Sequence, residues 1–238
     1  MAIKIMANRN TIICGSTNSG KTCCMLQIIK EGLVEPMPQK IIYMFNVKQR
    51  FMSLWNRNKD NPHIDFVEGL DFSKVTPKSI LVIDDLLLDI NKDVASSFIL
   101  GSHHKEISLF FITQNLFPRD PLFRLMSLNC HYFILFQNPR NYRQVETLAR
   151  QAFVNDVDRV IQAYKSASQQ TRGFIVLTFN PLIPNELRVI TDYFDRNFSV
   201  YLKNAKSDSK EGSKNTNKKV SDKEPKTTKK TRCKKENC

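Results

Sequence analysis

The sequence predicts an α/β protein, a three-layer sandwich in which helices cover both faces of a mainly parallel β-sheet. Strand-like and helix-like segments alternate along most of the chain, which is the pattern of a parallel sheet with helical crossovers. Several strand-like segments are apolar throughout, as strands covered on both faces are. The length of 238 residues allows one sizeable core. We therefore expect one domain of this class over most of the chain.

The first elements are a strand, a helix and two more strands. Residues 11–14 form a short β-branched run that ends at a glycine, which favours a strand. Residues 22–33 repeat apolar side chains at helical spacing, and Gly32 with two later prolines ends this helix. Residues 40–47 read KIIYMFNV, which is apolar enough for a buried strand. Residues 64–67 predict a shorter extended segment.

The later elements repeat the alternation. Residues 79–83 read SILVI, so both faces of this strand must be covered, as in the centre of a parallel sheet. Residues 91–100 carry apolar side chains on one helical face, and a glycine follows them. Residues 107–113 and 131–136 are further buried strands. Two helices and a late pair of strands complete the domain, at residues 144–153, 156–166, 174–179 and 187–190.

The positive charge is concentrated at the C-terminal end. The net charge is +13, and residues 203–238 hold 13 Lys and Arg against five Asp and Glu, or +8. This segment has almost no large apolar side chains, so we expect a disordered Lys-rich tail after a domain of residues 1–202. A basic arm suits nucleic acid or an acidic partner. A purely solubilising tail and a nuclear address are the alternatives.

Composition also bears on the compartment. No uninterrupted apolar run approaches the about 20 residues that cross a bilayer, and the N-terminus lacks the pattern of a secretory signal. The cysteines lack the paired spacing of a structural zinc site. Four of them lie among apolar residues, where cysteine acts as a small hydrophobe: Cys14, Cys23, Cys24 and Cys130. A protein of the cytosol or nucleus, without a membrane partner, is expected.

The sharpest motif is GSTNSGKT, which matches G-x-x-x-x-G-K-[ST] in full and lies between the first strand and the first helix. Its residues are the expected nucleotide-binding set: Gly15, Ser16, Thr17, Asn18, Ser19, Gly20, Lys21 and Thr22. The two glycines tolerate positive φ and let backbone N–H groups approach a phosphate. Lys21 is expected to reach the β- and γ-phosphates of ATP, and the Thr22 hydroxyl to ligate Mg²⁺.

Two later strands end in polar residues suited to hydrolysis. Asp84 and Asp85 follow the SILVI strand. We expect the first carboxylate to hold Mg²⁺ and the second to accept a proton from the attacking water. Gln114 ends the next strand, where its amide is placed to orient that water against the γ-phosphate. A P-loop NTPase of the RecA-like (ASCE) type is therefore expected.

The chain resembles the packaging ATPases of the FtsK–HerA superfamily over roughly residues 8 to 195. The motifs that carry this resemblance are GSTNSGKT, ILVIDDLL, GSHHKEISLFFITQNLFPRD, LNCHYFILFQNPRN and LARQAF. The nearest branch is the poxvirus-type genome-packaging ATPase of large DNA viruses and of Maverick/Polinton-like or adintovirus-like elements. A strand tipped by glutamine is a hallmark of the superfamily.

The resemblance implies a ring motor, usually a hexamer, that drives double-stranded DNA into a preformed capsid through its portal vertex. It implies an intracellular site of action in the host, in the nucleus or a cytoplasmic virus factory, and association with the virion. The family also uses an arginine finger from a neighbouring subunit. Arg143 is our first candidate for this role and Arg140 the second, and a solvated or DNA-facing role is the alternative for each.

Two other functions fit the phosphate-loop motif. A nucleoside or nucleotide kinase shares this core, but it needs an acceptor pocket and often an arginine-rich lid, which we do not identify in the sequence. A nucleotide-gated scaffold that binds DNA without turnover is disfavoured by Lys21, Asp84 and Asp85. Stimulation of ATP hydrolysis by DNA separates the motor from both.

Overall fold

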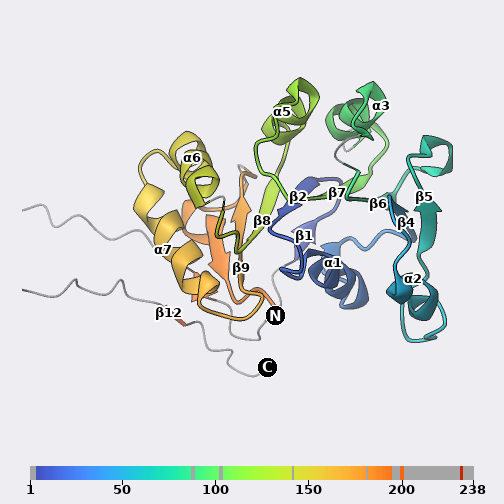
Figure 1. Ribbon diagram of the computed structural model, residues 1–238, viewed down its shortest axis with the longest axis horizontal. Helices are drawn as coiled ribbons and strands as arrows, with labels where there is room; N and C mark the ends of the chain where they lie inside the picture. The colour runs from blue at the N-terminus through green and yellow to red at the C-terminus, as the bar shows by residue number, and fades with distance from the viewer. Residues whose placement is uncertain are drawn as a thin grey trace, which may run out of the picture.

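A sheet of ten strands forms the centre of the part of the chain that the structure describes. The computed structural model describes residues 4–86, 89–101, 104–140, 142–180, 182–194, 199–200 and 231–232. The strands of the sheet are β2 (Asn10–Cys14), β4 (Lys40–Phe45), β5 (Asp65–Glu68), β6 (Ser79–Asp84), β7 (Ser108–Thr113), β8 (Tyr132–Phe136), β9 (Phe174–Thr178), β10 (Val189–Thr191), β11 (Ser199–Val200) and β12 (Thr231–Arg232). Their order across the sheet is β12–β11–β10–β9–β8–β2–β7–β6–β4–β5 (Figure 1).

The sheet is parallel in its larger part. Strands β8, β2, β7, β6, β4 and β5 pair in parallel, whereas β9, β10, β11 and β12 continue the sheet by antiparallel pairing. The expected fold class, a mainly parallel sheet with a late strand pair, is thus confirmed. Strand β7 lies between β2 and β6, so the end of β7 separates the phosphate loop from the acidic pair.

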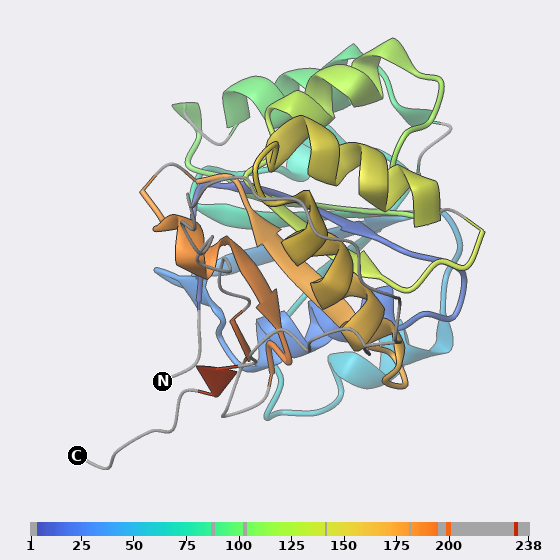
Figure 2. The same cartoon turned by 90° about the vertical axis from the view of Figure 1, so that its left-hand side faces the viewer.

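Helices cover both faces of the sheet and complete three layers (Figure 2). One face is covered by α1 (Lys21–Lys30) and α2 (Arg50–Trp55). The opposite face is covered by α3 (Lys92–Ser96), the π-helical turn η3 (Ser97–Gly101), α5 (Pro121–Leu128), α6 (Tyr142–Ala152) and α7 (Val157–Ser168). The 3₁₀ turns are η1 (Phe72–Lys74) and η4 (Asn185–Arg188). A separate parallel pair joins β1 (Ile5–Met6) to β3 (Val34–Glu35).

Side chains along the central strands point alternately to the two faces of the sheet and contribute to a hydrophobic core on each face. In β6, Leu81 and Ile83 pack with the layer of α3 to α7, while Ile80 and Val82 pack with the layer of α1. All six residues of β6 are buried. The apolar sequence SILVI therefore serves both faces, as expected from its composition.

Several expected elements differ from the structure. The helix expected at residues 91–100 is split into α3 and η3, in which Phe98 turns inward and is fully buried. Leu187 lies in η4 and is 41% exposed, because the amide of Leu187 bonds to the carbonyl of Pro184 and closes a 3₁₀ turn before β10. Helix α5 was not predicted, although Asp120 caps its N-terminus and Pro121 begins it.

The basic tail lies outside the described residues apart from one short strand. Within 203–238, the structure describes Thr231–Arg232, which form β12 beside β11. Along the described part of the chain, no helix is long and apolar enough to cross a membrane.

Candidate nucleotide-binding site

The phosphate loop connects the end of β2 to the start of α1. Gly20 has φ +106° and Asn18 has φ +62°, so the chain curls through left-handed conformations directly before the helix. Gly15 was expected to permit the curl because glycine tolerates positive φ, but its backbone is not left-handed. Its requirement is steric: a Cβ at Gly15 would lie 2.5 Å from Cβ of Phe136 and 2.8 Å from Oγ of Ser19.

Lys21 lies folded over this loop. Its Nζ donates hydrogen bonds to the carbonyls of Gly15 at 3.0 Å and Ser16 at 2.8 Å. Burial lowers the pKa of Lys21, and the carboxylates of Asp84 and Asp85 oppose that shift. The first turn of α1 carries no acidic side chain. A tightly curled backbone, a helix N-terminus and a half-buried ammonium together fit a bound phosphate.

Ser19 supports the same interpretation. Its Oγ is buried and has no hydrogen-bond partner within the described residues. Buried polar groups are normally paired, so an unpaired hydroxyl inside a glycine loop fits a site built to receive a polar ligand.

Two hydroxyl groups hold the Asp84 carboxylate in place. The Thr22 hydroxyl donates to Oδ2 of Asp84 at 3.3 Å, and the Tyr43 hydroxyl donates to the same oxygen at 2.6 Å. Burial raises the pKa of Asp84, against the opposing effect of the Tyr43 hydrogen bond. Burial also raises the pKa of Tyr43, and the charge of Asp84 adds to that shift. A hydroxyl beside one fixed carboxylate suits Mg²⁺, which binds few protein oxygens and takes the rest from phosphate and water.

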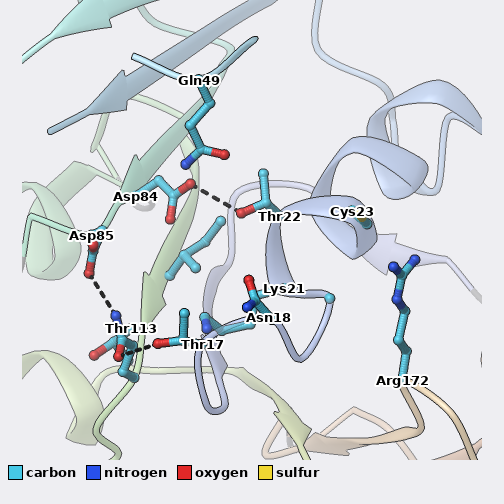
Figure 3. Close-up of a pocket in the computed structure, with 13 residues that line it drawn as sticks. Thr17, Asn18, Lys21, Thr22, Cys23, Gln49, Asp84, Asp85, Thr113 and Arg172 are labelled. Carbon is cyan, nitrogen blue, oxygen red and sulfur yellow. Dashed lines mark hydrogen bonds between the residues drawn. The ribbon is translucent and has the colours of Figure 1, made fainter. Parts of the chain in front are cut away.

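Asp85 has a different environment from its neighbour. It is exposed, and its backbone has φ +57°, a region that non-glycine residues rarely occupy. Nε2 of Gln114 donates to Oδ1 of Asp85 at 3.4 Å, while Oε1 of Gln114 accepts from the Thr17 hydroxyl at 3.0 Å. One amide therefore bridges the phosphate loop and the second acidic residue, and Figure 3 draws the two hydrogen bonds as dashed lines that start at Thr17 and Asp85.

These residues line one cleft of about 390 Å³. The expected site residues on its walls are Thr17, Asn18, Gly20, Lys21, Thr22, Asp84, Asp85 and Gln114. Arg143 on α6 and Arg140 in the preceding loop are exposed and do not line it. The arginine-finger role of either residue, which requires a second subunit, stays a prediction. No cluster of three metal-binding side chains occurs in the described ranges.

Sequence reasoning missed Tyr43, which is buried behind the cleft and donates to Asp84, and it also missed several residues of the cleft walls. The available signal for Tyr43 was a side chain with a hydroxyl group in the largely apolar strand β4. Arg172 and Gln49 come from loops and carry no comparable signal. Cys23 was expected among apolar residues, but it is exposed and lines the cleft, because it occupies the outer side of the first turn of α1. The other described cysteines, Cys14, Cys24 and Cys130, are buried as expected.

Comparison with known proteins yields structural neighbours. No protein-family model and no curated protein sequence matches this chain. B204, the DNA-packaging ATPase from Sulfolobus Turreted Icosahedral Virus, aligns with a TM-score of 0.52 and 13% identity over 74% of this chain and 95% of that chain. The genome packaging NTPase B204 from Sulfolobus turreted icosahedral virus 2, in complex with ATP-gammaS, aligns with a TM-score of 0.45 and 12% identity over 74% of this chain and 95% of that chain. EssC (ATPases 2 and 3) from Geobacillus thermodenitrificans aligns with a TM-score of 0.39 and 15% identity over 56% of this chain and 32% of that chain. At such identities the likeness to the first B204 shows a shared fold.

Proposed function

We propose that this chain is a Mg²⁺-dependent ATPase that works as a genome-packaging motor on double-stranded DNA. The observation that carries the ATPase proposal is the Gln114 amide, which joins Thr17 of the phosphate loop to Asp85. This arrangement brings a phosphate cradle, a polar amide and a carboxylate to one cleft, as hydrolysis of a γ-phosphate requires. The fold likeness to B204, a DNA-packaging ATPase, supports the packaging role together with the sequence resemblance.

The two carboxylates suit two different tasks. Asp84 is 5% exposed and held by two hydroxyl groups, which suits a fixed ligand. Thr22 and Asp84 would hold Mg²⁺, which would neutralise charge on the phosphate oxygens. Asp85 is exposed and receives one long hydrogen bond, which suits a group that must meet water and accept its proton. Lys21 contacts the β- and γ-phosphates, and Gln114 orients the water.

The finer parts of the proposal come from the resemblance. We propose a homo-oligomeric ring, usually hexameric in such motors, that meets a capsid at its portal vertex. The branch is proposed to be the poxvirus-type one, and the place of action the host nucleus or a cytoplasmic virus factory. In this ring, Arg143, or else Arg140, reaches the nucleotide of the neighbouring subunit.

ATP turnover measured with and without double-stranded DNA tests the proposal, run beside native mass. We expect hydrolysis that DNA stimulates, loss of turnover in Lys21→Ala, and a fall of about 10²-fold in Asp85→Asn with ATP binding retained. Turnover that ignores DNA and needs a nucleoside would instead identify a kinase. ATP binding without hydrolysis would identify a nucleotide-gated scaffold.

A further inference from the structure

Arg172 lies at the phosphate loop although it is far from the loop in sequence. It belongs to the turn between α7 and β9 and lines the nucleotide cleft. Its side chain runs over Gly20: a Cβ at Gly20 would meet Cδ of Arg172 at 3.3 Å. Within the described residues, no hydrogen bond or ion pair engages its guanidinium. A cation without an acidic partner is therefore held against a loop built for anions.

Hydrogen bonds and close packing fix the conformation of the turn that carries Arg172. The amide of Gly173 bonds to the carbonyl of Gln170 at 3.0 Å, and Nε2 of Gln170 donates to Asp192 at 3.0 Å. A Cβ at Gly173 would overlap the carbonyl oxygen of Ala167, so the backbone at Gly173 packs directly against the end of α7 and leaves no space for a side chain. Arg172 itself has φ +60°. Non-glycine residues keep such a conformation only where the surroundings hold it, and these positions cluster at ligand sites.

The position of Arg172 differs from that of the hydrolytic residues. In Figure 3 its side chain extends toward the first turn of α1, on the side of Lys21 away from Asp85. The γ-phosphate belongs on the side of Asp85 and Gln114, because the attacking water must be activated there. The other end of the phosphate chain then leaves the loop toward Arg172.

We propose that Arg172 binds the α-phosphate end of the nucleotide in its own subunit and so contributes affinity that does not depend on the γ-phosphate. This inference rests on the proposed ATPase function. It assigns Arg172 a role different from an arginine finger, which acts on the transferring phosphoryl group. Arg172 holds ATP and ADP alike, and it leaves the rate of the chemical step to Lys21, Asp85 and Gln114.

The test compares affinities for MgATP and MgADP by titration calorimetry on the full chain. Arg172→Asn removes the cation, and asparagine tolerates φ near +60° better than alanine does. We expect both nucleotides to bind about 10- to 100-fold more weakly, as for loss of a charge-assisted contact. At saturating ATP, kcat should stay within about threefold, because ground state and transition state lose the same contact. Arg172→Lys should recover most of the affinity.

Controls separate this inference from the function on which it rests. Arg57→Asn removes an exposed arginine outside the cleft and should change neither affinity. If ATP weakens while ADP does not, Arg172 contacts the γ-phosphate and the inference is wrong. Unchanged affinities in a folded Arg172→Asn protein also overturn it, while the ATPase proposal survives if Lys21→Ala loses turnover. A wild-type protein that binds neither nucleotide overturns both.

Discussion

Replacement of Gly15 by alanine tests whether the phosphate loop has the tight geometry described above. The added methyl would lie 2.5 Å from Cβ of Phe136 and 2.8 Å from Oγ of Ser19. Carbon atoms in contact normally lie about 3.5–4.0 Å apart, so the overlap with Phe136 is about 1 Å or more. Phe136 cannot retreat easily, because it is buried in β8, which pairs with both β2 and β9. Gly15 or its neighbours must move instead.

The expected cost follows from this overlap. Inserting a methyl group into a well-packed site costs about 1–3 kcal/mol. In a domain of about 200 residues each kcal/mol shifts the melting temperature by about 2–4 °C, so Gly15→Ala should melt about 2–12 °C lower. Because the displaced backbone carries the amides meant for phosphate, ATP affinity should fall by about tenfold or more.

Gly101→Ala is the matched control. A Cβ at Gly101 would find its nearest atom, Cδ1 of Ile107, at 3.6 Å, which is ordinary contact. Its backbone is not left-handed, so alanine should leave stability unchanged or raise it by up to about 1 kcal/mol. Thermal unfolding and ATP titration of both variants make the comparison. The reasoning fails if Gly15→Ala melts with the wild type and binds ATP with the same Kd.

Three other predictions concern the acidic side and the tail. Burial raises the folded-state pKa of Asp84, so its proton stabilises the fold below the ordinary value of 3.8 and that contribution is lost as pH rises through the raised pKa. Asp84→Asn should therefore unfold at a higher denaturant concentration than wild type at pH 7 without Mg²⁺, and it should lose this advantage below pH 3.8. It should also weaken Mg²⁺-dependent ATP binding, while a variant less stable than wild type at pH 7 would contradict the reasoning. Tyr43→Phe removes a hydrogen bond to the Asp84 carboxylate and should weaken Mg²⁺-dependent ATP binding about tenfold. Tyr193→Phe is the control and should leave this binding unchanged, because the Tyr193 hydroxyl has no hydrogen-bond partner among the described residues. Equal effects of the two substitutions would argue against a role of Tyr43 in positioning Asp84. Deleting residues 203–238, which carry +8, should reduce the slope of log DNA affinity against log salt by several units at about 0.9 per phosphate contact; an unchanged slope would mean that the tail does not bind DNA.

The features that could be predicted are those with a local pattern or a simple topological rule. The strands were recognised because apolar runs such as SILVI need cover on both faces, and the loop because its glycines and lysine have fixed spacing. Gln114 was expected to act on the same water as Asp85, and the structure joins the two side chains because neighbouring parallel strands end at the same edge of a sheet. The roles assigned to these residues remain proposals.

The features that were missed depend on contacts between distant segments. Tyr43 meets Asp84 across 41 residues, and an apolar strand pattern does not show which side chain carries a hydroxyl to a carboxylate. Arg172 reaches Gly20 only because α7 and the turn after it bring it back to the loop. Helix α5 has its start signals, but its eight residues are too few for periodicity to stand out.

Strand β7, which lies between β2 and β6, sets the distance between the phosphate loop and the acidic pair. Neighbouring strands lie about 4.8 Å apart, so one intervening strand separates the tip of β2 from the tip of β6 by about 10 Å. A gap of that width accommodates a phosphate and a water molecule between the loop and the carboxylates, whereas direct neighbours would leave half of it. All six residues of β7 are buried, which makes the spacing rigid. A chain that lost the Gln114 side chain would keep the gap and lose the group that fills it.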